Sequence, residues 1–342
     1  MAPALSVLLP IRDAERTLAV ALGSVLRSRA VDLEVVAVLH GCRDRSAAVL
    51  SRVARGDPRV LVVDAAPALS LGGALELGRA RCRAPLIARM DADDVMHPER
   101  LAADAAWLAE RPRTGAVGCR VRLAPRHAPE DGRHAGLVAY LAWQNAALSA
   151  ADHQRELWIE QPLCHPATTF RTAALDAVGG WRTSPAPFPE DYDLFLRLSC
   201  AGWALEKRAA LHHAWRIHAG LATRNPRDLL ARVKAEHLVA RFGLAARPVI
   251  VCGAGKEGRR IARALATQGV EPAAFVDVAP DKVGRRRRNL VVRHADELAA
   301  LRAELPGSFA LGAVGTSGAR GVVRAGLERA GFVEGESFVV VA

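Results

Sequence analysis

Short apolar runs alternate with segments of helical periodicity over the first 90 residues, and this alternation constrains the fold more than any other feature. The spacing predicts strands at 5–9, 33–39, 60–63 and 86–90, with helices at 15–26, 46–54 and 71–82. Strands that alternate with helices in this way form a parallel sheet covered on both faces. Such sheets bind ligands outside the carboxyl ends of their strands. The chain therefore begins with a predicted α/β domain whose site lies at one sheet edge.

Three aspartates, Asp91, Asp93 and Asp94, follow the fourth predicted strand. Carboxylates crowded at the end of a buried strand repel one another, and a hard cation such as Mg²⁺ or Mn²⁺, shared with substrate phosphates, relieves that repulsion. The alternative is a solvated acidic turn in which Asp94 or His97 caps a helix that begins at Pro98. The spacing alone leaves both interpretations open.

Composition indicates an ordinary globular protein with two domains. The chain has 342 residues, 51% hydrophobic and 24% charged, which argues against long disorder. Its net charge of +11 is spread over both parts of the chain and forms no basic arm, so we expect no nucleic-acid partner. The basic run at 285–288 is either a solvated turn or a contact for phosphate or an anionic membrane surface.

Cysteine usage and hydropathy indicate a cytoplasmic protein. The six cysteines form no CxxC pair, which argues against a zinc site and against a disulfide framework. The N-terminal apolar run has no positively charged region before it, so we expect no signal peptide. No segment reaches about 18 uninterrupted apolar residues, the length that an ordinary membrane span needs.

Four segments resemble, in order, the successive motifs of family 2 glycosyltransferases with the GT-A fold. They are SVLLPIRDAERTLAVALGSVL (6–26), ARMDADDVMHPERL (88–101), HPATTFRTAALDAVGGW (165–181) and PEDYDLFLRLSCAGW (189–203). The resemblance covers about residues 5–223. It implies an enzyme that moves a sugar from a nucleotide-diphosphate donor to a hydroxyl of a glycan or lipid-linked acceptor. A basic enzyme of this kind could visit the inner membrane surface to reach a lipid-linked acceptor.

The resemblance implies that the Asp-Ala-Asp motif is the metal and nucleotide site. Asp93 is then the direct metal ligand, Asp91 faces the nucleotide and Asp94 supports them. A cation at this place neutralises the leaving diphosphate as charge develops on it. Arg89 is expected either to meet phosphate or to be the partner of the acidic cluster.

The Glu190-Asp191 pair resembles the family's ED motif, which supplies a general base. We expect Asp191 to take the proton of the acceptor hydroxyl and Glu190 to support it, in a loop before a helix that begins near Tyr192. The alternative is that both residues merely cap this helix, where its dipole favours acids. With one base and no covalent nucleophile, the displacement should be single and should invert the anomeric configuration.

Further residues are placed near the donor by the resemblance. Pro10 and Asp44 follow the first two strands and are expected to contact the nucleotide. His218 is expected to complete the metal shell or to touch phosphate, with a surface histidine as the open alternative. Many relatives carry Asp-Asp-Gly-Ser after the second strand, where this chain has Leu39-His40-Gly41-Cys42. The acid that usually meets the nucleotide base is absent, so UDP, dTDP and GDP all remain open.

The acceptor side is less well marked. Residues 136–160 read as one or two amphipathic helices with aromatic side chains, among them Trp158. These side chains form either an acceptor platform or ordinary core. Glu160 and His165 are expected to line the acceptor cleft.

A second unit is predicted after a linker at 243–247. Its first strand leads into a GxGxxG turn at Gly253, Gly255 and Gly258, and Asp277 ends its next strand. This is the dinucleotide-binding fingerprint in its required context, and the spacing alone would indicate NAD. Only about 95 residues remain, however, too few for a catalytic domain of its own.

The second unit also resembles the small Rossmann-like domain that precedes the β-helix of bacterial sugar O-acetyltransferases, whose repeats this sequence lacks. The predicted organisation is therefore a GT-A glycosyltransferase domain at 1–243 and a Rossmann-like accessory domain at 244–342, which binds a nucleotide or a partner or is structural.

Three other functions are alternatives to a glycosyltransferase. A sugar-nucleotide pyrophosphorylase needs a glycine-rich phosphate loop after the first strand, and residues 10–14 are no such loop. A non-catalytic nucleotide-binding regulator is compatible with the altered Leu39-His40 pair, although Asp93 and Asp191 speak against it. An NAD-dependent oxidoreductase would be detected by titration with a nicotinamide cofactor.

Overall fold

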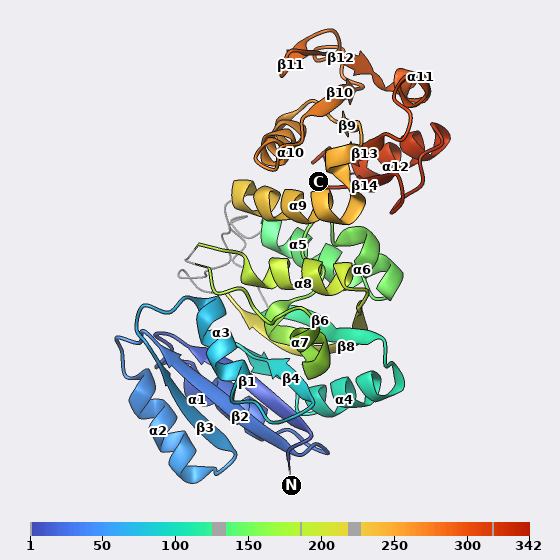
Figure 1. The fold of residues 1–342 in the computed structure, drawn as a ribbon. Coiled ribbons are helices and arrows are strands. Elements are labelled where there is room, and N and C mark those ends of the chain that lie inside the picture. The colour runs from blue at the N-terminus through green and yellow to red at the C-terminus, as the bar shows by residue number, and fades with distance from the viewer. Residues whose placement is uncertain (1, 125–134, 185–186, 218–226, 317) are drawn as a thin grey trace. The chain divides into compact units, whose positions relative to one another are not determined.

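The computed structural model describes residues 2–124, 135–184, 187–217, 227–316 and 318–342 (Figure 1). By its internal contacts the chain forms two compact units. The first comprises Met1–His153 and Pro162–Arg224, and the second comprises Gln154–Gln161 and Asn225–Ala342. Within the described ranges, no helix combines the length and the apolar character that crossing a bilayer needs.

The described residues of the first unit form one eight-stranded sheet in the order β3-β2-β1-β4-β7-β6-β8-β5. Its strands are β1 (Leu5–Ile11), β2 (Leu33–His40), β3 (Val60–Ala65), β4 (Leu86–Arg89), β5 (Val95–Met96), β6 (Thr114–Ala124), β7 (Thr168–Arg171) and β8 (Ala204–Arg216). The first four strands are parallel to one another, as predicted. Strand β7 is antiparallel to β4 and β6, β8 is parallel to β6, and β5 is antiparallel to β8.

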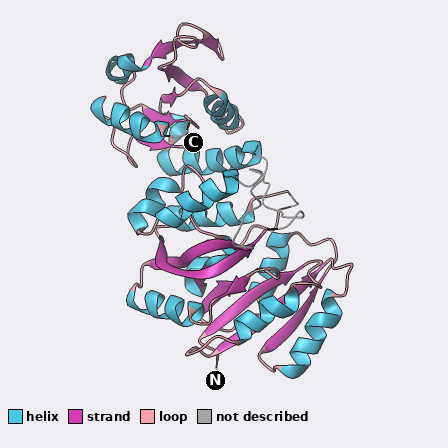
Figure 2. Cartoon of the chain, turned by 180° about the vertical axis from the view of Figure 1, so that it is seen from behind, coloured by secondary structure: helices cyan, strands magenta, loops and turns pink. Residues whose placement is uncertain are grey.

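Helices lie on both sides of this sheet (Figure 2). They are α1 (Leu18–Leu26), α2 (Ser46–Gly56), α3 (Leu71–Arg79), α4 (Arg100–Glu110), α5 (Ala135–Ala146), α6 (Ala150–Glu156), the 3₁₀ turn η1 (His165–Ala167), α7 (Thr172–Ala177) and α8 (Glu190–Cys200). Every residue of β1 and β2 is buried, which explains why both strands are mostly apolar. The predicted α/β class, with a mostly parallel sheet, is confirmed.

The second unit has its own sheet, in the order β11-β12-β10-β9-β13-β14. Its elements are α9 (Arg227–Phe242), β9 (Val249–Cys252), α10 (Lys256–Ala266), β10 (Pro272–Asp277), β11 (Arg286–Arg287), β12 (Leu290–His294), α11 (Leu298–Glu304), β13 (Phe309–Gly312), α12 (Ala319–Arg329) and β14 (Phe338–Val340). All its strand pairs are parallel except β11 with β12.

The contacts divide the chain before α9 and not at the predicted boundary of 243/244. Lys234 of α9 is buried and donates to the carbonyl oxygens of Ile159 (2.8 Å) and Val341 (2.6 Å). At the end of the same helix, the Phe242 ring lies 4.6 Å from that of Phe309. Helix α9 therefore shares the core of the second unit.

Candidate active site

The three aspartates predicted to bind a cation lie together beyond the carboxyl end of β4. One carboxylate oxygen of each of Asp91, Asp93 and Asp94 lies within 4.8 Å of the other two. Asp94 is fully buried, and the other two are half-buried. The side chains form a compact set of oxygen donors at the edge where parallel sheets bind ligands.

Asp94 has both carboxylate oxygens occupied. Oδ1 accepts from the backbone N–H of Arg216, and Oδ2 lies 2.8 Å from Nε2 of His213. The other ring nitrogen of His213, Nδ1, lies 3.2 Å from the guanidinium of Arg100. A guanidinium can only donate, so the proton of the neutral imidazole sits on Nε2 and is donated to Asp94. This arrangement suits an ionised Asp94.

Burial opposes that ionised form. Burial and the nearby charge of Asp91 raise the pKa of Asp94 to about 8. The hydrogen bond from the Arg216 N–H lowers the pKa of Asp94, but burial and the charge of Asp91 outweigh it, so the net shift is upward. A divalent cation at the cluster would favour the ionised form and remove the conflict. The donor set thus fits Mg²⁺ or Mn²⁺.

The same place holds a buried cation that pairs directly with the cluster. The guanidinium of Arg89 is buried and forms an ion pair with Asp91. Of the two roles expected for Arg89, partner of the acidic cluster is the one present. The Arg89 charge also acts on Glu190, whose pKa is nevertheless raised to about 8, first by burial and then by the charge of Asp191. Residues about 100 positions apart in the sequence therefore influence one another in one site.

Helix α8 begins at Glu190 and not near Tyr192, so the predicted position of the acidic pair in a loop is wrong. Pro189 is the N-cap residue, and both acids lie in the first helical turn, where the helix dipole favours negative charge. Asp191 Oδ1 lies 2.7 Å from the N–H of Tyr192. A Cβ at Gly72 of α3 would lie 3.4 Å from Cβ of Glu190 and would collide with the Arg182 carbonyl. Glycine at this point lets α3 approach the start of α8.

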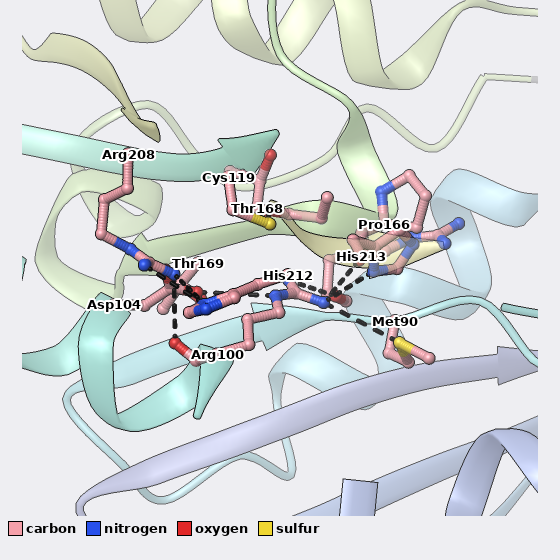
Figure 3. Close-up of polar contacts among 12 residues, drawn as sticks. Met90, Arg100, Asp104, Cys119, Pro166, Thr168, Thr169, Arg208, His212 and His213 are labelled. Carbon is pink, nitrogen blue, oxygen red and sulfur yellow. Dashed lines mark hydrogen bonds and ion pairs between the residues drawn. The ribbon is translucent and has the colours of Figure 1, made fainter. Parts of the chain in front are cut away.

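A buried polar network holds the histidine that faces Asp94 (Figure 3). Arg100 contacts His213 and donates to the carbonyl oxygen of Arg89 at 3.1 Å. Arg100 Nε lies 3.5 Å from Asp104, which also accepts from Arg208 at 2.6 and 2.8 Å. Burial, with the charge of Arg100, keeps the pKa of His213 well below its usual range, so the ring is neutral. The guanidinium of Arg100 thereby fixes the tautomer that donates to the cluster.

His213 was missed from the sequence, where a different histidine was preferred. His218 lies outside the described residues. His213 belongs to β8 and Asp94 precedes β5, and the antiparallel pairing of these strands brings them together across 119 positions. No spacing signal in the sequence marks such a pair.

A cavity of about 320 Å³ opens at the carboxyl ends of β1, β2 and β3. It is lined by Arg12, Leu39, Gly41, Cys42, Arg43, Ala47, Asp64, Ala65 and Pro67. Leu39 occupies the place where many relatives carry an acid, as the sequence indicated. Asp64, the penultimate residue of β3, lines this cavity and was missed, although an acid after the apolar run of a third parallel strand is a signal of the same kind as Asp91.

Pro10 and Asp44 are absent from this lining. Pro10 is buried within β1. The carboxylate of Asp44 accepts from the N–H groups of Glu15 (2.8 Å) and Ser46 (2.9 Å) and from the Ser46 hydroxyl (2.5 Å). Burial raises the pKa of Asp44, but these hydrogen bonds outweigh it and the net shift is downward. Asp44 therefore ties the loops after β1 and β2 together at the rim of the cavity.

His165, which was expected on the acceptor side, and Trp158, for which core packing was one alternative, both lie in the core. His165 is 4% exposed, its Nε2 accepts from Trp181 Nε1 at 3.0 Å, and its ring packs against those of Phe170 and Phe195. It therefore does not line a cleft. Trp158 is 5% exposed and packs against an aromatic ring of α9, which matches the core interpretation.

The glycine turn of the second unit joins β9 to α10, as predicted. Gly253 has φ +119°, and a Cβ at Gly258 would collide with the Gly253 carbonyl oxygen. Asp277 Oδ2 accepts from the N–H of Ala254 in this turn at 2.8 Å and lies 3.1 Å from the Lys282 ammonium. The acid that was expected to contact a nucleotide is bonded to its own turn.

Comparisons with known proteins agree with this geometry. The family described as glycosyl transferase family 2 matches residues 6–179. The chain belongs to this family. It is 29% identical over 170 residues to the amylovoran biosynthesis glycosyltransferase AmsE of Erwinia amylovora, an alignment that covers 49% of this chain and 59% of AmsE. The chain thus matches about three fifths of the length of this curated relative.

Solved structures share the fold. S. aureus TarS 1-349 in complex with UDP-GlcNAc superposes with a TM-score of 0.56 at 14% identity, covering 78% of this chain and 72% of that one. TarS 1-349 without that ligand gives a TM-score of 0.55 over 78% and 71% of the two chains, also at 14% identity. The predicted GT-A fold and the predicted family are confirmed.

Proposed function

We propose that this family 2 glycosyltransferase is cation-dependent and inverting, and that it moves a sugar from a nucleotide-diphosphate donor to a hydroxyl of a glycan or lipid-linked acceptor. The observation that carries the proposal is the meeting of Asp91, Arg89 and Glu190 at the strand edge beyond β4. A single-displacement transferase needs a cation site for the diphosphate and a base side by side; Asp91 would help to hold the cation, and Glu190 would support the base, Asp191.

Asp93 and Asp91 would hold the cation, with Asp94 behind them. A bound Mg²⁺ or Mn²⁺ would supply Lewis-acid stabilisation of the leaving diphosphate. Arg89 holds Asp91 in place and adds fixed positive charge beneath the cluster. His218 remains a proposed further ligand.

The donor nucleotide would lie toward the cavity at the ends of β1, β2 and β3, which offers positive charge from Arg12 and Arg43 and one acid, Asp64. Pro10 and Asp44 would contribute by shaping its rim. The UDP-GlcNAc complex of TarS supports a nucleotide-sugar donor. The product we propose is a cell-envelope polysaccharide, and the relative AmsE is named for the biosynthesis of amylovoran.

The two acidic residues at the start of α8 would have different roles. Glu190, whose pKa is raised, keeps a proton near neutral pH, which leaves Asp191 ionised as the base. Asp191 would take the proton of the acceptor hydroxyl as its oxygen bonds to the anomeric carbon and the bond from that carbon to the diphosphate breaks. The configuration at this carbon inverts because the attack is in line.

The second unit would act as an accessory domain. The backbone N–H groups at Gly253, Gly255 and Gly258 open a helix and would approach a phosphate of a nucleotide or of a partner. Asp277 would hold this turn. The basic surface of the whole chain also suits a peripheral visit to an anionic membrane when the acceptor is lipid-linked.

Calorimetry of the full chain against UDP, dTDP and GDP, with Mn²⁺ or with EDTA, tests the donor half of the proposal. We expect one diphosphate to bind with Mn²⁺ and to lose most of its affinity in EDTA. The matching sugar donors, supplied with a panel of acceptors, then test transfer by the configuration of the product. Equal binding with and without the cation would remove the metal claim, and retained configuration would remove the single displacement.

A further inference from the structure

Two histidines face each other across β5 and β8, outside the site described above. The N–H of His97, which follows β5, donates to the carbonyl oxygen of His212 at 2.9 Å. Their rings are stacked, with centroids 4.8 Å apart and an interplanar angle of 10°. Because neighbouring strand residues point to opposite faces of a sheet, His213 faces Asp94 and His212 faces away from it.

A carboxylate completes this group. Glu99 lies two residues after His97, and one ligand atom of each of Glu99, His97 and His212 lies within 4.8 Å of the other two. Glu99 and His97 are exposed, and His212 is half-buried. These side chains come from two segments more than 100 residues apart, and the backbone hydrogen bond between the histidines already fixes their separation.

The donor set differs in kind from that of the aspartate cluster. Two imidazoles with one carboxylate suit Zn²⁺ and its neighbours in the transition series, whereas an all-oxygen cluster suits Mg²⁺. Burial, with the charges of Arg208 and His97, lowers the pKa of His212, so its ring is in the neutral form that binds metals. The charge of Arg208 itself is paired with Asp104 at 2.6 Å.

We propose that His97, Glu99 and His212 form a binding site for one divalent transition-metal ion of the Zn²⁺ class, with water completing its shell. Ligands at about 2.0–2.2 Å from one ion lie roughly 3–3.5 Å apart, so the side chains close in by rotation while the backbone stays in place. The exposed side chains of His97 and Glu99 have the freedom for this rotation.

Such an ion would tie two segments of the sheet together. It would join the start of α4 and the end of β5, the strand that follows Asp94, to β8. It would also compete with the contact of 3.4 Å between His212 Nδ1 and Arg208, the outer member of the network behind the active site. The site would therefore stabilise the segment that carries the aspartate cluster.

Zinc titration of the full chain tests the proposal, with Mg²⁺ in large excess to occupy the aspartate cluster and with no nucleotide present. We expect calorimetry to give one Zn²⁺ per chain and His97→Ala and His212→Ala to weaken binding at least tenfold. His294→Ala is the matched control, because the half-buried His294 also lies beside an acid, Asp296, at 3.1 Å in the second unit. It should bind Zn²⁺ as the wild type does.

His97→Ala decides the outcome, because this exposed side chain contributes little to the core. With Zn²⁺, the thermal midpoint should rise in the wild type and in His294→Ala but not in His97→Ala. The proposal is overturned if the wild type binds no Zn²⁺ under these conditions, if His97→Ala binds it unchanged, or if only Asp93→Asn reduces binding. Asp93→Asn belongs to the aspartate cluster and should leave this site intact.

Discussion

Both units place an aspartate at or after the carboxyl end of a buried parallel strand, but the surroundings of these acids differ. Asp94 follows β4 beside two further carboxylates, and burial together with Asp91 raises its pKa to about 8. Asp277 ends β10. Burial raises its pKa too, but hydrogen bonds from the N–H groups of Ala279 and Ala254 and from Lys282 outweigh burial and lower it overall.

The two acids differ in what compensates their negative charge. Asp94 needs a ligand for this, whereas the charge of Asp277 is compensated by other residues of the chain. Around Asp94 three carboxylates lie within 4.8 Å of one another, so an added divalent ion would lower the free energy of the cluster. Asp277 holds the glycine turn through Ala254 and is held by Lys282. A strand-end acid therefore predicts a ligand site only where the surrounding chain leaves its charge uncompensated.

Replacing a metal ligand should give the largest effect. Asp93→Ala removes a central oxygen donor, so we expect transfer to fall by about 10³-fold or more and Mn²⁺-dependent nucleotide binding to be lost, with the fold unchanged by circular dichroism. Asp277→Asn is the matched control and should transfer at the wild-type rate. The proposed difference between the aspartate cluster and Asp277 would be contradicted if both variants lost activity equally or if Asp93→Ala retained full turnover.

The acidic pair of α8 gives the next largest effect. Losing a positioned base typically costs about 10² to 10⁴ in rate, so Asp191→Asn should lower kcat by that factor while donor affinity stays near that of the wild type. Glu190→Gln keeps a neutral group where the raised pKa already favours one, and it should cost less. A crippled Glu190→Gln beside an active Asp191→Asn would reverse the assignment of the two roles.

The strands and the aspartate cluster could be predicted because their signals are local. Strands buried on both faces are mostly apolar, and β1, β2 and β4 read that way apart from single polar residues such as Glu34 and Arg89. The place of the cluster followed from the rule that parallel strands present ligands at their carboxyl ends. Helix α8 began earlier than predicted because Pro189 serves as its N-cap, and the sequence also allowed this proline to end a rigid loop.

What could not be predicted depends on contacts between distant segments. The link from Arg100 through His213 to Asp94 exists only because β5 and β8 pair, and isolated polar residues in these segments read as surface. The domain boundary has the same cause. Gly243 could be predicted as a turn residue because glycine readily adopts turn conformations. The unit to which α9 belongs depends instead on the burial of Lys234.

Cation affinity should depend on pH in the first unit. A folded-state pKa of about 8 for Asp94, against an ordinary 3.8, gives a contribution to stability that is full below about 3.8 and is lost as the pH rises through about 8. A bound cation must displace that proton. The affinity for Mg²⁺ should therefore rise by up to about tenfold per pH unit between pH 6 and 8 and level off above it. Calorimetry without nucleotide measures this slope, and a flat profile would contradict the raised pKa.

The smallest effect is expected at Asp277, and its sign is opposite. Its lowered pKa means that its contribution to stability is present above the ordinary value of 3.8 and is lost as the pH falls through the lower, folded-state value. Asp277→Asn weakens charge-assisted bonds to Ala254, Ala279 and Lys282, so the second unit should lose about 1–3 kcal/mol of unfolding free energy at pH 7. Denaturant titration at pH 7 and near pH 3 should show this deficit shrinking in acid, the reverse of the trend at Asp94.

A deficit that stays constant with pH would mean that the geometry of the turn, and not the charge of Asp277, provides the stabilisation. A nucleotide that stabilised the wild type but not Asp277→Asn would instead show that this acid serves a ligand, and the contrast between the two units would then fail.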